Sequence, residues 1–235
     1  MNEFSSALSH VRWTPVDDVT ELSSLGYLRV LACAERAIAQ SGRFMIVLAG
    51  GNTPYGVYRQ LASADTNWSC WHIYFGDERC LTRDDTGRNS HMAGNLWLDH
   101  VPIPAAQQHV ISAELGAREA AMAYAQTLHD VPDFDLVLLG LGEDGHTASL
   151  FPDHDWGMAS DSADVLPIFD APKAPMERVS MSAHRLSRTN EALFLVAGES
   201  KRAAVQRWRI GANIPARSIQ ASTGVEVLVE SRLLF

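Results

Sequence analysis

Short runs of consecutive apolar residues recur along the chain, and each ends at a glycine-rich or charged turn. Four such runs span 44–48 (FMIVL), 71–75 (WHIYF), 134–139 (FDLVLL) and 192–196 (ALFLV). Nearly continuous apolar runs of this length are typical of strands that are buried on both faces of a parallel sheet. The C-terminal stretch 225–229 (VEVLV) alternates instead, which predicts an edge strand.

Helix-forming segments lie between these runs. We predict helices over 19–40, 54–63, 117–129 and 200–210, the second of which begins at a proline, a residue favoured in a first helical turn. Strands that alternate with helices predict an α/β fold with an open, doubly wound, mostly parallel sheet of the modified Rossmann-like type and helices on both faces.

The 235 residues suit a single α/β domain over 1–235. One stretch, 153–175, holds three prolines and many polar residues, and we interpret it as a surface excursion with one strand at 165–169. Ligands of doubly wound sheets bind at the carboxyl ends of the strands. The glycine-rich and charged clusters of this chain all follow predicted strands, so we expect them to meet at that edge.

Composition narrows the classes of partner. The net charge of −9 argues against a nucleic-acid partner, because phosphates would be repelled, but a few local cations can still hold a small anion. No run reaches the roughly 20 apolar residues that span a membrane, and residues 1–9 lack the pattern of a secretory signal. Cys33, Cys70 and Cys80 form no Cys-x-x-Cys pair, which favours a reducing, cytoplasmic location.

The first candidate cluster follows run 44–48 and contains Gly50, Gly51, Asn52 and Thr53. Two glycines allow a ligand to approach the backbone closely, and the N–H groups at the start of a helix suit an anion. The alternative is a tight turn in which Thr53 caps the following helix. The cluster alone does not decide between these interpretations.

A second cluster, Asp77, Glu78 and Arg79, directly follows run 71–75. We expect its charged side chains to point into the same cleft. The alternative is a solvated strand end with an Asp–Arg pair, and taken alone the cluster favours that alternative.

The third cluster, 140–147 (GLGEDGHT), follows the strongest predicted strand. His146 lies there in a glycine-dense loop beside acidic residues, where a group that transfers protons is expected, since histidine titrates near neutral pH. Either Asp144 or Asp77 could orient its ring. The spacing Gly140-x-Gly142-x-x-Gly145 also matches a dinucleotide fingerprint, but the two acidic residues in the loop and a proline soon after it argue against such a site.

Two further cations are candidates for binding a phosphate. Lys201 lies at the start of a predicted helix, and Arg178 precedes a short apolar stretch; for either residue alone, simple solvation at the surface is the stronger alternative. The chain has no Gly-x-Ser-x-Gly elbow, Walker loop or His-Glu-x-x-His sequence. The segment 153–155 (DHD) could bind a metal weakly, but a solvated loop explains it better.

Taken in this order, the clusters resemble the 6-phosphogluconolactonase family. The corresponding segments are 49–54 (AGGNTP), 71–79 (WHIYFGDER), Asn89 with the segment after it, 140–152 (GLGEDGHTASLFP) and 198–201 (GESK). The resemblance spans roughly 20–230. Its departures include Ala49 and Asn52, which replace two serines of the family's phosphate loop.

The resemblance implies hydrolysis of a phosphorylated sugar δ-lactone without a metal or other cofactor. His146 would act as the base that activates water, Arg79 or N–H groups of the glycine loop would stabilise the oxyanion, and Asp77 or Asp144 would position His146 or Arg79. Gly50, Gly51, Asn52 and Thr53, with Lys201 and Arg178, would hold the phosphate. We expect a monomer or small homo-oligomer.

Two alternatives remain. The sibling amino-sugar-phosphate deaminase/isomerases share the Asp-Gly-His loop, but they carry a glutamate that transfers protons where this chain has Phe151. A phenyl ring cannot transfer protons, which favours the lactonase. A sugar-phosphate sensor without turnover would be expected to have lost His146 or Arg79, and would usually carry an added DNA-binding domain, for which about 20 residues before the first predicted helix leave too little room.

Overall fold

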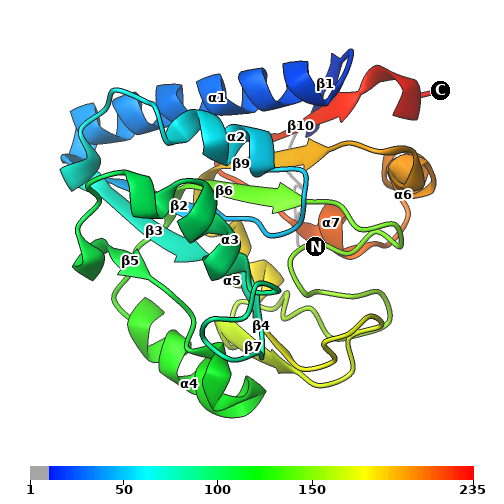
Figure 1. Cartoon of the computed structure of the whole chain (residues 1–235). Helices are drawn as coiled ribbons and strands as arrows, with labels where there is room; N and C mark the ends of the chain where they lie inside the picture. Colours follow the sequence, from blue (N-terminus) through cyan, green and yellow to red (C-terminus); the bar gives the residue numbers. More distant parts are fainter. Residues whose placement is uncertain (1–10) are drawn as a thin grey trace, which may run out of the picture.

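The computed structural model describes residues 11–235. The stretch 1–9, interpreted above as lacking a secretory signal, lies outside these residues. A parallel sheet of seven strands forms the centre of the molecule (Figure 1). In spatial order the strands are β1 (Val11–Val16), β10 (Val225–Glu230), β9 (Thr189–Val196), β6 (Phe134–Gly140), β2 (Phe44–Leu48), β3 (Trp71–Phe75) and β5 (Gln108–His109).

Helices cover both faces of this sheet, as the sequence predicted. The α-helices are α1 (Val19–Ser41), α2 (Tyr55–Leu61), α3 (Asn89–Leu96), α4 (Ala117–Leu128), α5 (Ala183–Ser187), α6 (Arg202–Arg209) and α7 (Pro215–Ser218). Neighbouring residues of β9 show the two layers: the side chain of Leu195 lies against Gly26 of α1, whereas the ring of Phe194 lies 4.7 Å from that of Trp208 of α6. Adjacent strand residues point to opposite faces, so α1 and α6 lie on opposite sides.

Short 3₁₀ helices complete the connections. They are η1 (Trp68–Cys70), η2 (Leu98–His100), η3 (Ala105–Gln107), η4 (Ala113–Leu115), η5 (Glu199–Lys201) and η6 (Ser231–Leu233). The predicted helix at 200–210 is therefore a 3₁₀ turn followed by a regular helix.

The longest helix, α1, has both ends fixed by the sequence. The Asp18 carboxylate accepts hydrogen bonds from the N–H groups of Thr20 and Glu21, which caps the start of the helix. At the other end Gly42 adopts φ 76°, and its N–H donates to Ile38 O. A left-handed glycine in this position is a common helix terminator.

A second, antiparallel sheet joins the central one. Its order is β4 (Asp77–Arg79), β8 (Arg178–Met181) and β7 (Val165–Ile168). The strand predicted at 165–169 is thus present as β7, but β4 and β8 were not predicted as strands. Buried apolar residues of β7 and β8 belong to the same core as the large sheet.

The prediction that 225–229 forms an edge strand was wrong. β10 lies second in the sheet and is buried throughout, and the unpredicted β1 forms the edge. Glu226 produces the polar alternation, but its carboxylate is paired: Arg12 Nη2 lies 2.7 Å and Arg29 Nε 3.0 Å from its Oε2. Pro15 suits β1 because an edge strand tolerates a residue without an N–H donor.

Candidate active site

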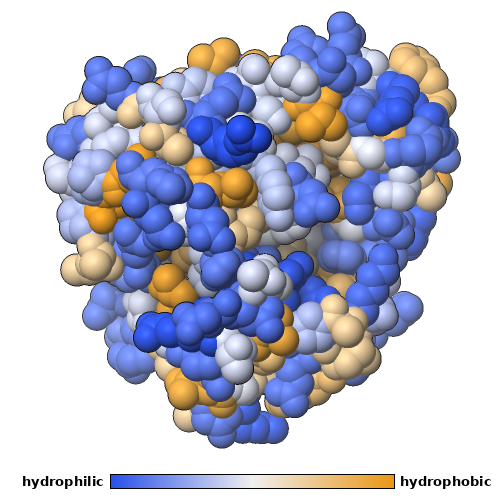
Figure 2. All heavy atoms as spheres, viewed as in Figure 1, coloured by the Kyte–Doolittle hydropathy of each residue, from blue (hydrophilic) through white to orange (hydrophobic). Residues whose placement is uncertain are grey.

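The pocket that holds the predicted site residues lies where the winding direction of the sheet reverses. From β2 the chain proceeds outward through β3 and β5, and from β6 it proceeds the other way through β9 and β10. The connections that follow the neighbouring strands β2 and β6 therefore lead in opposite directions and leave a crevice at the carboxyl ends of these strands, the usual ligand site of doubly wound sheets. The cavity has a volume of about 180 Å³. Figure 2 shows this face hollowed near its centre, with hydrophilic residues around much of the rim.

Most residues that the sequence predicted for the site line this cavity. They are Gly50, Gly51, Asn52, Thr53, Asp77, Arg79, His146, Arg178 and Lys201. Asp144 lies behind the lining and reaches the site through its contact with His146.

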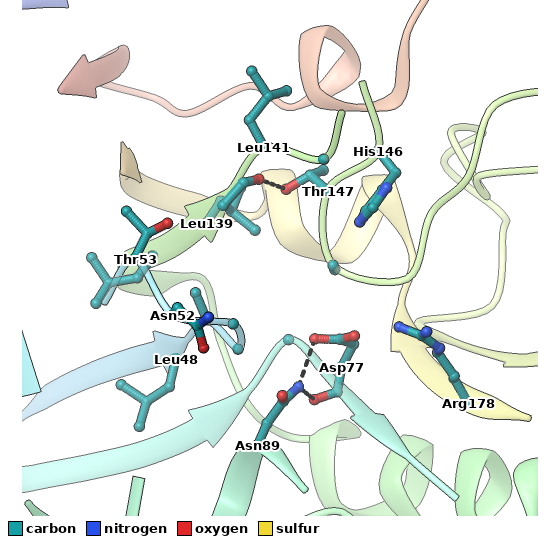
Figure 3. Close-up of a pocket in the computed structure, with 18 of the residues that line it drawn as sticks. Leu48, Asn52, Thr53, Asp77, Asn89, Leu139, Leu141, His146, Thr147 and Arg178 are labelled. Carbon is teal, nitrogen blue, oxygen red and sulfur yellow. Dashed lines mark hydrogen bonds between the residues drawn. The ribbon is translucent and has the colours of Figure 1, made fainter. Parts of the chain in front are cut away.

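The His146 ring is held by a carboxylate of its own loop. Its Nδ1 lies 2.6 Å from Asp144 Oδ1, and the same oxygen accepts the N–H of His146 at 3.1 Å. Burial opposes ionisation of Asp144, but these contacts with His146 outweigh burial and lower the pKa of Asp144. An ionised carboxylate only accepts hydrogen bonds, so Nδ1 carries a proton, and in the neutral ring the lone pair is then on Nε2. In residues 11–235 Nε2 has no hydrogen-bond partner, and Figure 3 shows the ring pointing into the pocket.

The glycines of the loop make this placement of His146 possible. A Cβ atom on Gly142 would lie 2.0 Å from His146 Nδ1, so only glycine fits beside the ring. Gly145 adopts φ +90°, a conformation that favours glycine. The N–H groups of Gly142, Gly145 and His146 all donate within the loop, to His146 O, Gly142 O and Asp144 Oδ1. Those three N–H groups are therefore not free to bind an oxyanion, whereas Arg79 lines the pocket.

An aromatic ring packs beside the histidine. The centroid of Phe151 lies 4.9 Å from that of His146, and Phe151 is buried. The Arg178 guanidinium lies over the same Phe151 ring, 5.6 Å from its centroid. The position that distinguishes this chain from the sibling deaminases is therefore in contact with the base candidate, and it offers only an apolar surface.

Asp77 contacts other partners than the histidine. Its Oδ1 accepts from Asn89 Nδ2 at 3.0 Å, and its Oδ2 accepts from Ser149 Oγ at 2.6 Å. The carboxylate is almost fully buried at the floor of the pocket. Of the two residues left open by the sequence, it is Asp144 that contacts His146.

Glu78 points away from the cleft, contrary to the expectation that the three charged residues of its cluster share it. Its side chain is fully buried and accepts the N–H groups of Asn89 (2.7 Å) and Ser90 (2.8 Å) at the start of α3. Arg88 Nε lies 3.5 Å from its Oε2. Because Asp77, Glu78 and Arg79 form strand β4, successive side chains point to opposite sides.

Cationic side chains approach the pocket from separate elements. Arg79 Nη1 is anchored to Gly87 O at 2.5 Å. Arg178 donates from Nε to Pro175 O and from Nη2 to Lys173 O, so it fastens the loop between β7 and β8. Burial lowers the pKa of Lys201, while the nearby Glu143 carboxylate opposes this shift.

The loop after β2 is shaped by its two glycines. Gly51 adopts φ +78°, and a Cβ on Gly50 would lie 2.1 Å from Asn89 Oδ1. The N-cap of α2 is Pro54, and no side chain caps the helix, so Thr53 does not act as the cap that the alternative interpretation required. The Thr53 side chain lines the pocket instead.

Sequence reasoning missed Asn89 as a site residue. It appeared only within a segment that resembled the family, yet it lines the pocket and holds Asp77. No local pattern marks an asparagine at a helix start as functional. In the segment 153–155, His154 Nε2 lies 3.4 Å from Asp170 Oδ2. Within residues 11–235 no group of three or more His, Cys, Asp or Glu side chains could hold a metal ion.

Known proteins resemble this chain over most of its length. The model of the family "Glucosamine-6-phosphate isomerases/6-phosphogluconolactonase" matches residues 17–228. The chain belongs to this family. Among curated relatives, the 6-phosphogluconolactonase of Mycobacterium leprae is 35% identical over 84% of each chain. That of Synechocystis sp. is 36% identical over 75% of this chain and 78% of the relative.

The fold is shared with solved members of the family. The crystal structure of 6-phosphogluconolactonase from Thermotoga maritima superimposes with a TM-score of 0.87 at 23% identity, covering 94% of this chain and all of that one. None of the helices within 11–235 has the length and apolar character that crossing a membrane requires.

Proposed function

We propose that the chain hydrolyses 6-phospho-D-glucono-1,5-lactone to 6-phosphogluconate, a step of the oxidative pentose phosphate pathway, with His146 as general base. Its curated relatives of 35–36% identity carry the name of this activity. The observation that carries the mechanism is the His146 ring, which is held through Nδ1 by Asp144 and presents Nε2 to the pocket.

In the first step, Nε2 of His146 takes a proton from water while the water oxygen adds to the lactone carbonyl carbon. The ring becomes an imidazolium, which the Asp144 carboxylate at 2.6 Å stabilises. One positioned base of this kind contributes roughly 10²–10⁴-fold to the rate. The lactone is already reactive, so modest catalysis suffices.

In the second step, the tetrahedral intermediate collapses. Arg79, a cation in the pocket lining, stabilises the oxyanion. The N–H donors of Gly142, Gly145 and His146 are used within their loop and do not take part. The bond between the carbonyl carbon and the ring oxygen breaks, and the proton held by His146 moves to that oxygen. The products are a free hydroxyl and a carboxylic acid, which releases its proton to solvent and becomes a carboxylate, and His146 is neutral again.

The phosphate of the substrate lies against the loop Gly50–Thr53. This loop offers backbone N–H groups, a glycine at φ +78° and the polar side chains of Asn52 and Thr53. Lys201 lines the same pocket and, in residues 11–235, its ammonium has no carboxylate within 4 Å, so it is free to bind an anion. Arg178 lines the same pocket and adds positive charge to it, although two of its nitrogens are used by the loop that it holds.

These roles require neither a metal nor an organic cofactor, so activity should persist in EDTA. The partner is a small phosphorylated lactone rather than a nucleic acid or a membrane, and we place the enzyme in the cytoplasm as a monomer or small homo-oligomer. Residues 1–235 would act as one α/β catalytic domain, since one apolar core extends through both sheets of the described part.

The deciding experiment follows acid release from freshly generated 6-phosphogluconolactone, with and without enzyme, for wild type and His146→Ala. Hydrolysis well above the spontaneous rate by wild type, and near that rate by the variant, supports both the activity and the base. If wild type does not exceed the spontaneous rate, the lactonase proposal is wrong and glucosamine 6-phosphate is the next substrate to test. Equal activity of the two proteins would keep the lactonase but remove His146 as its base.

A further inference from the structure

Asn89 is a polar residue of the pocket to which the mechanism above gives no role. It begins α3 and is almost fully buried, yet it lines the cavity. Its Nδ2 donates to Asp77 twice, to the main-chain oxygen at 2.9 Å and to Oδ1 at 3.0 Å. Both partners can only accept hydrogen bonds, so the nitrogen of the amide must face Asp77 and the oxygen must face the other way.

The amide oxygen is fixed over the phosphate loop. A Cβ on Gly50 would lie only 2.1 Å from Asn89 Oδ1, so the oxygen packs directly against this glycine. The backbone N–H of Asn89 donates to the buried Glu78 carboxylate at 2.7 Å, which holds the start of the helix in place. Within 11–235 no donor reaches Oδ1, and it is not an enclosed atom, so it is open to the pocket.

Asp77 extends this surface toward the histidine. Each carboxylate oxygen accepts one hydrogen bond, from Asn89 or from Ser149, and retains a further lone pair. Figure 3 shows the Asp77 carboxylate on the side of the pocket below His146, with Asn89 next to it and Asn52 and Thr53 beyond. Three acceptor atoms thus line one wall of the pocket: Asp77 Oδ1, Asp77 Oδ2 and Asn89 Oδ1.

A wall made of acceptors selects for donors. A phosphate or carboxylate of the substrate would be repelled by Asp77, whereas uncharged hydroxyl groups can donate to it. The wall lies between the loop that holds Thr53 and the ring of His146. A substrate that has its phosphate at the Thr53 loop and its reacting carbonyl at His146 places its secondary ring hydroxyls against this wall.

We propose that Asn89 and Asp77 form a subsite for the secondary hydroxyls of the sugar lactone, and that Asn89 Oδ1 is a specificity-determining contact to one of them. This inference rests on the lactonase function proposed above. A lactone without that hydroxyl leaves the Asn89 acceptor without a substrate partner, which costs binding in the transition state.

The test pairs enzyme variants with substrate variants. The 2-, 3- and 4-deoxy analogues of the phosphorylated lactone are generated in situ, and kcat/KM is measured for each and for the parent lactone. Wild type should disfavour at least one deoxy lactone by roughly 5- to 150-fold, the range for a polar group left unpaired. Asn89→Ala should lose most of that discrimination, because the acceptor is absent for both substrates.

Ser149→Ala is the matched control. Ser149 holds the other oxygen of Asp77 but is fully buried outside the pocket lining. Its loss should slow the parent and deoxy lactones by similar factors and keep the wild-type discrimination. Asn89→Ser, which also removes Oδ1 but keeps a polar residue at the helix start, repeats the measurement if Asn89→Ala does not fold.

The outcomes separate the two proposals. Discrimination that is the same in wild type and the Asn89 variants would make Asn89 a structural residue and overturn the subsite, and so would a wild type that accepts every deoxy lactone as well as the parent. Failure of wild type to hydrolyse the parent lactone would instead remove the lactonase function, and the subsite with it.

Discussion

Nδ1 of His146 lies 2.6 Å from Oδ1 of Asp144, and the two residues are separated by a single glycine. The contact sets the tautomer of the ring, because a carboxylate can only accept the Nδ1 proton. It also keeps Asp77 free for a different task at the floor of the pocket. The short loop thus contains both the base and the group that orients it.

The substitution Asp144→Asn should impair catalysis while the fold is retained. The amide that it introduces can donate to Nδ1 of His146, which stabilises the tautomer with its proton on Nε2, the wrong one for accepting a proton from water. We expect kcat to fall by roughly 10²–10⁴-fold, the contribution of a general base, with little change in KM. Steady-state kinetics of lactone hydrolysis provide the measurement, and Glu143→Gln, which removes a neighbouring loop charge without contact to the ring, should retain most activity. A change in KM alone would contradict the assignment.

Gly142 should be intolerant of any side chain, although it does not itself react. A Cβ there would lie 2.0 Å from His146 Nδ1 and would displace the ring from Asp144. Gly142→Ala should therefore lower kcat by about tenfold or more, since small displacements of a catalytic group are costly. Gly140→Ala is the matched control, because a Cβ at Gly140 meets no atom within 4 Å. Equal kinetics of the two variants would show that the ring has room to move.

Much of the central sheet was predictable, because strands that are buried on both faces appear in the sequence as short, nearly continuous apolar runs. The runs 44–48, 71–75, 134–139 and 192–196 all form parallel strands. The glycine-rich turns after β2 and β6 were then expected at one edge, and they do meet there. The rule that ligands bind at the carboxyl ends of strands therefore located the site from local pattern alone.

The errors arise where long-range pairing overrides local pattern. Alternation in β10 indicated an edge strand, but its polar residue Glu226 is neutralised by Arg12 and Arg29, which lie far away in sequence. β4 has only three residues, all charged, and becomes a strand because β8 pairs with it. The role of Asn89 depends on contacts with Asp77 and Gly50, which no spacing in the sequence reveals.

Glu78 should matter for stability, because its charge is buried and paired. It is fully buried against Arg88 and accepts the N–H groups at the start of α3. Glu78→Ala would leave the two N–H donors at the start of α3 without their acceptor and would remove one of the two carboxylates beside the buried Arg88 guanidinium, which keeps Glu114. We expect a loss of about 3–5 kcal/mol in the free energy of unfolding. Urea denaturation measures it, and Glu35→Ala on the exposed side of α1 should change it by less than about 0.5 kcal/mol. A loss below about 1 kcal/mol would show that the network is dispensable.

Two stacked histidines at the edge of the sheet should make stability fall in mild acid. The ring centroids of His72 of β3 and His109 of β5 lie 6.0 Å apart. Burial lowers the pKa of each ring below its ordinary value of 6.5. The charge of Arg43 lowers the pKa of His72 further, and His72 does the same for His109. A lowered folded pKa means that the stabilisation is complete above pH 6.5 and is lost as pH falls through the folded pKa values, because the unfolded chain binds the protons first. Urea midpoints between about pH 7.5 and 5 should therefore drop, and the drop should be smaller in a His72→Gln, His109→Gln double variant. His129→Gln, at an exposed position, serves as the control and should keep the wild-type slope; an unchanged slope in the double variant would assign the acid sensitivity to other groups.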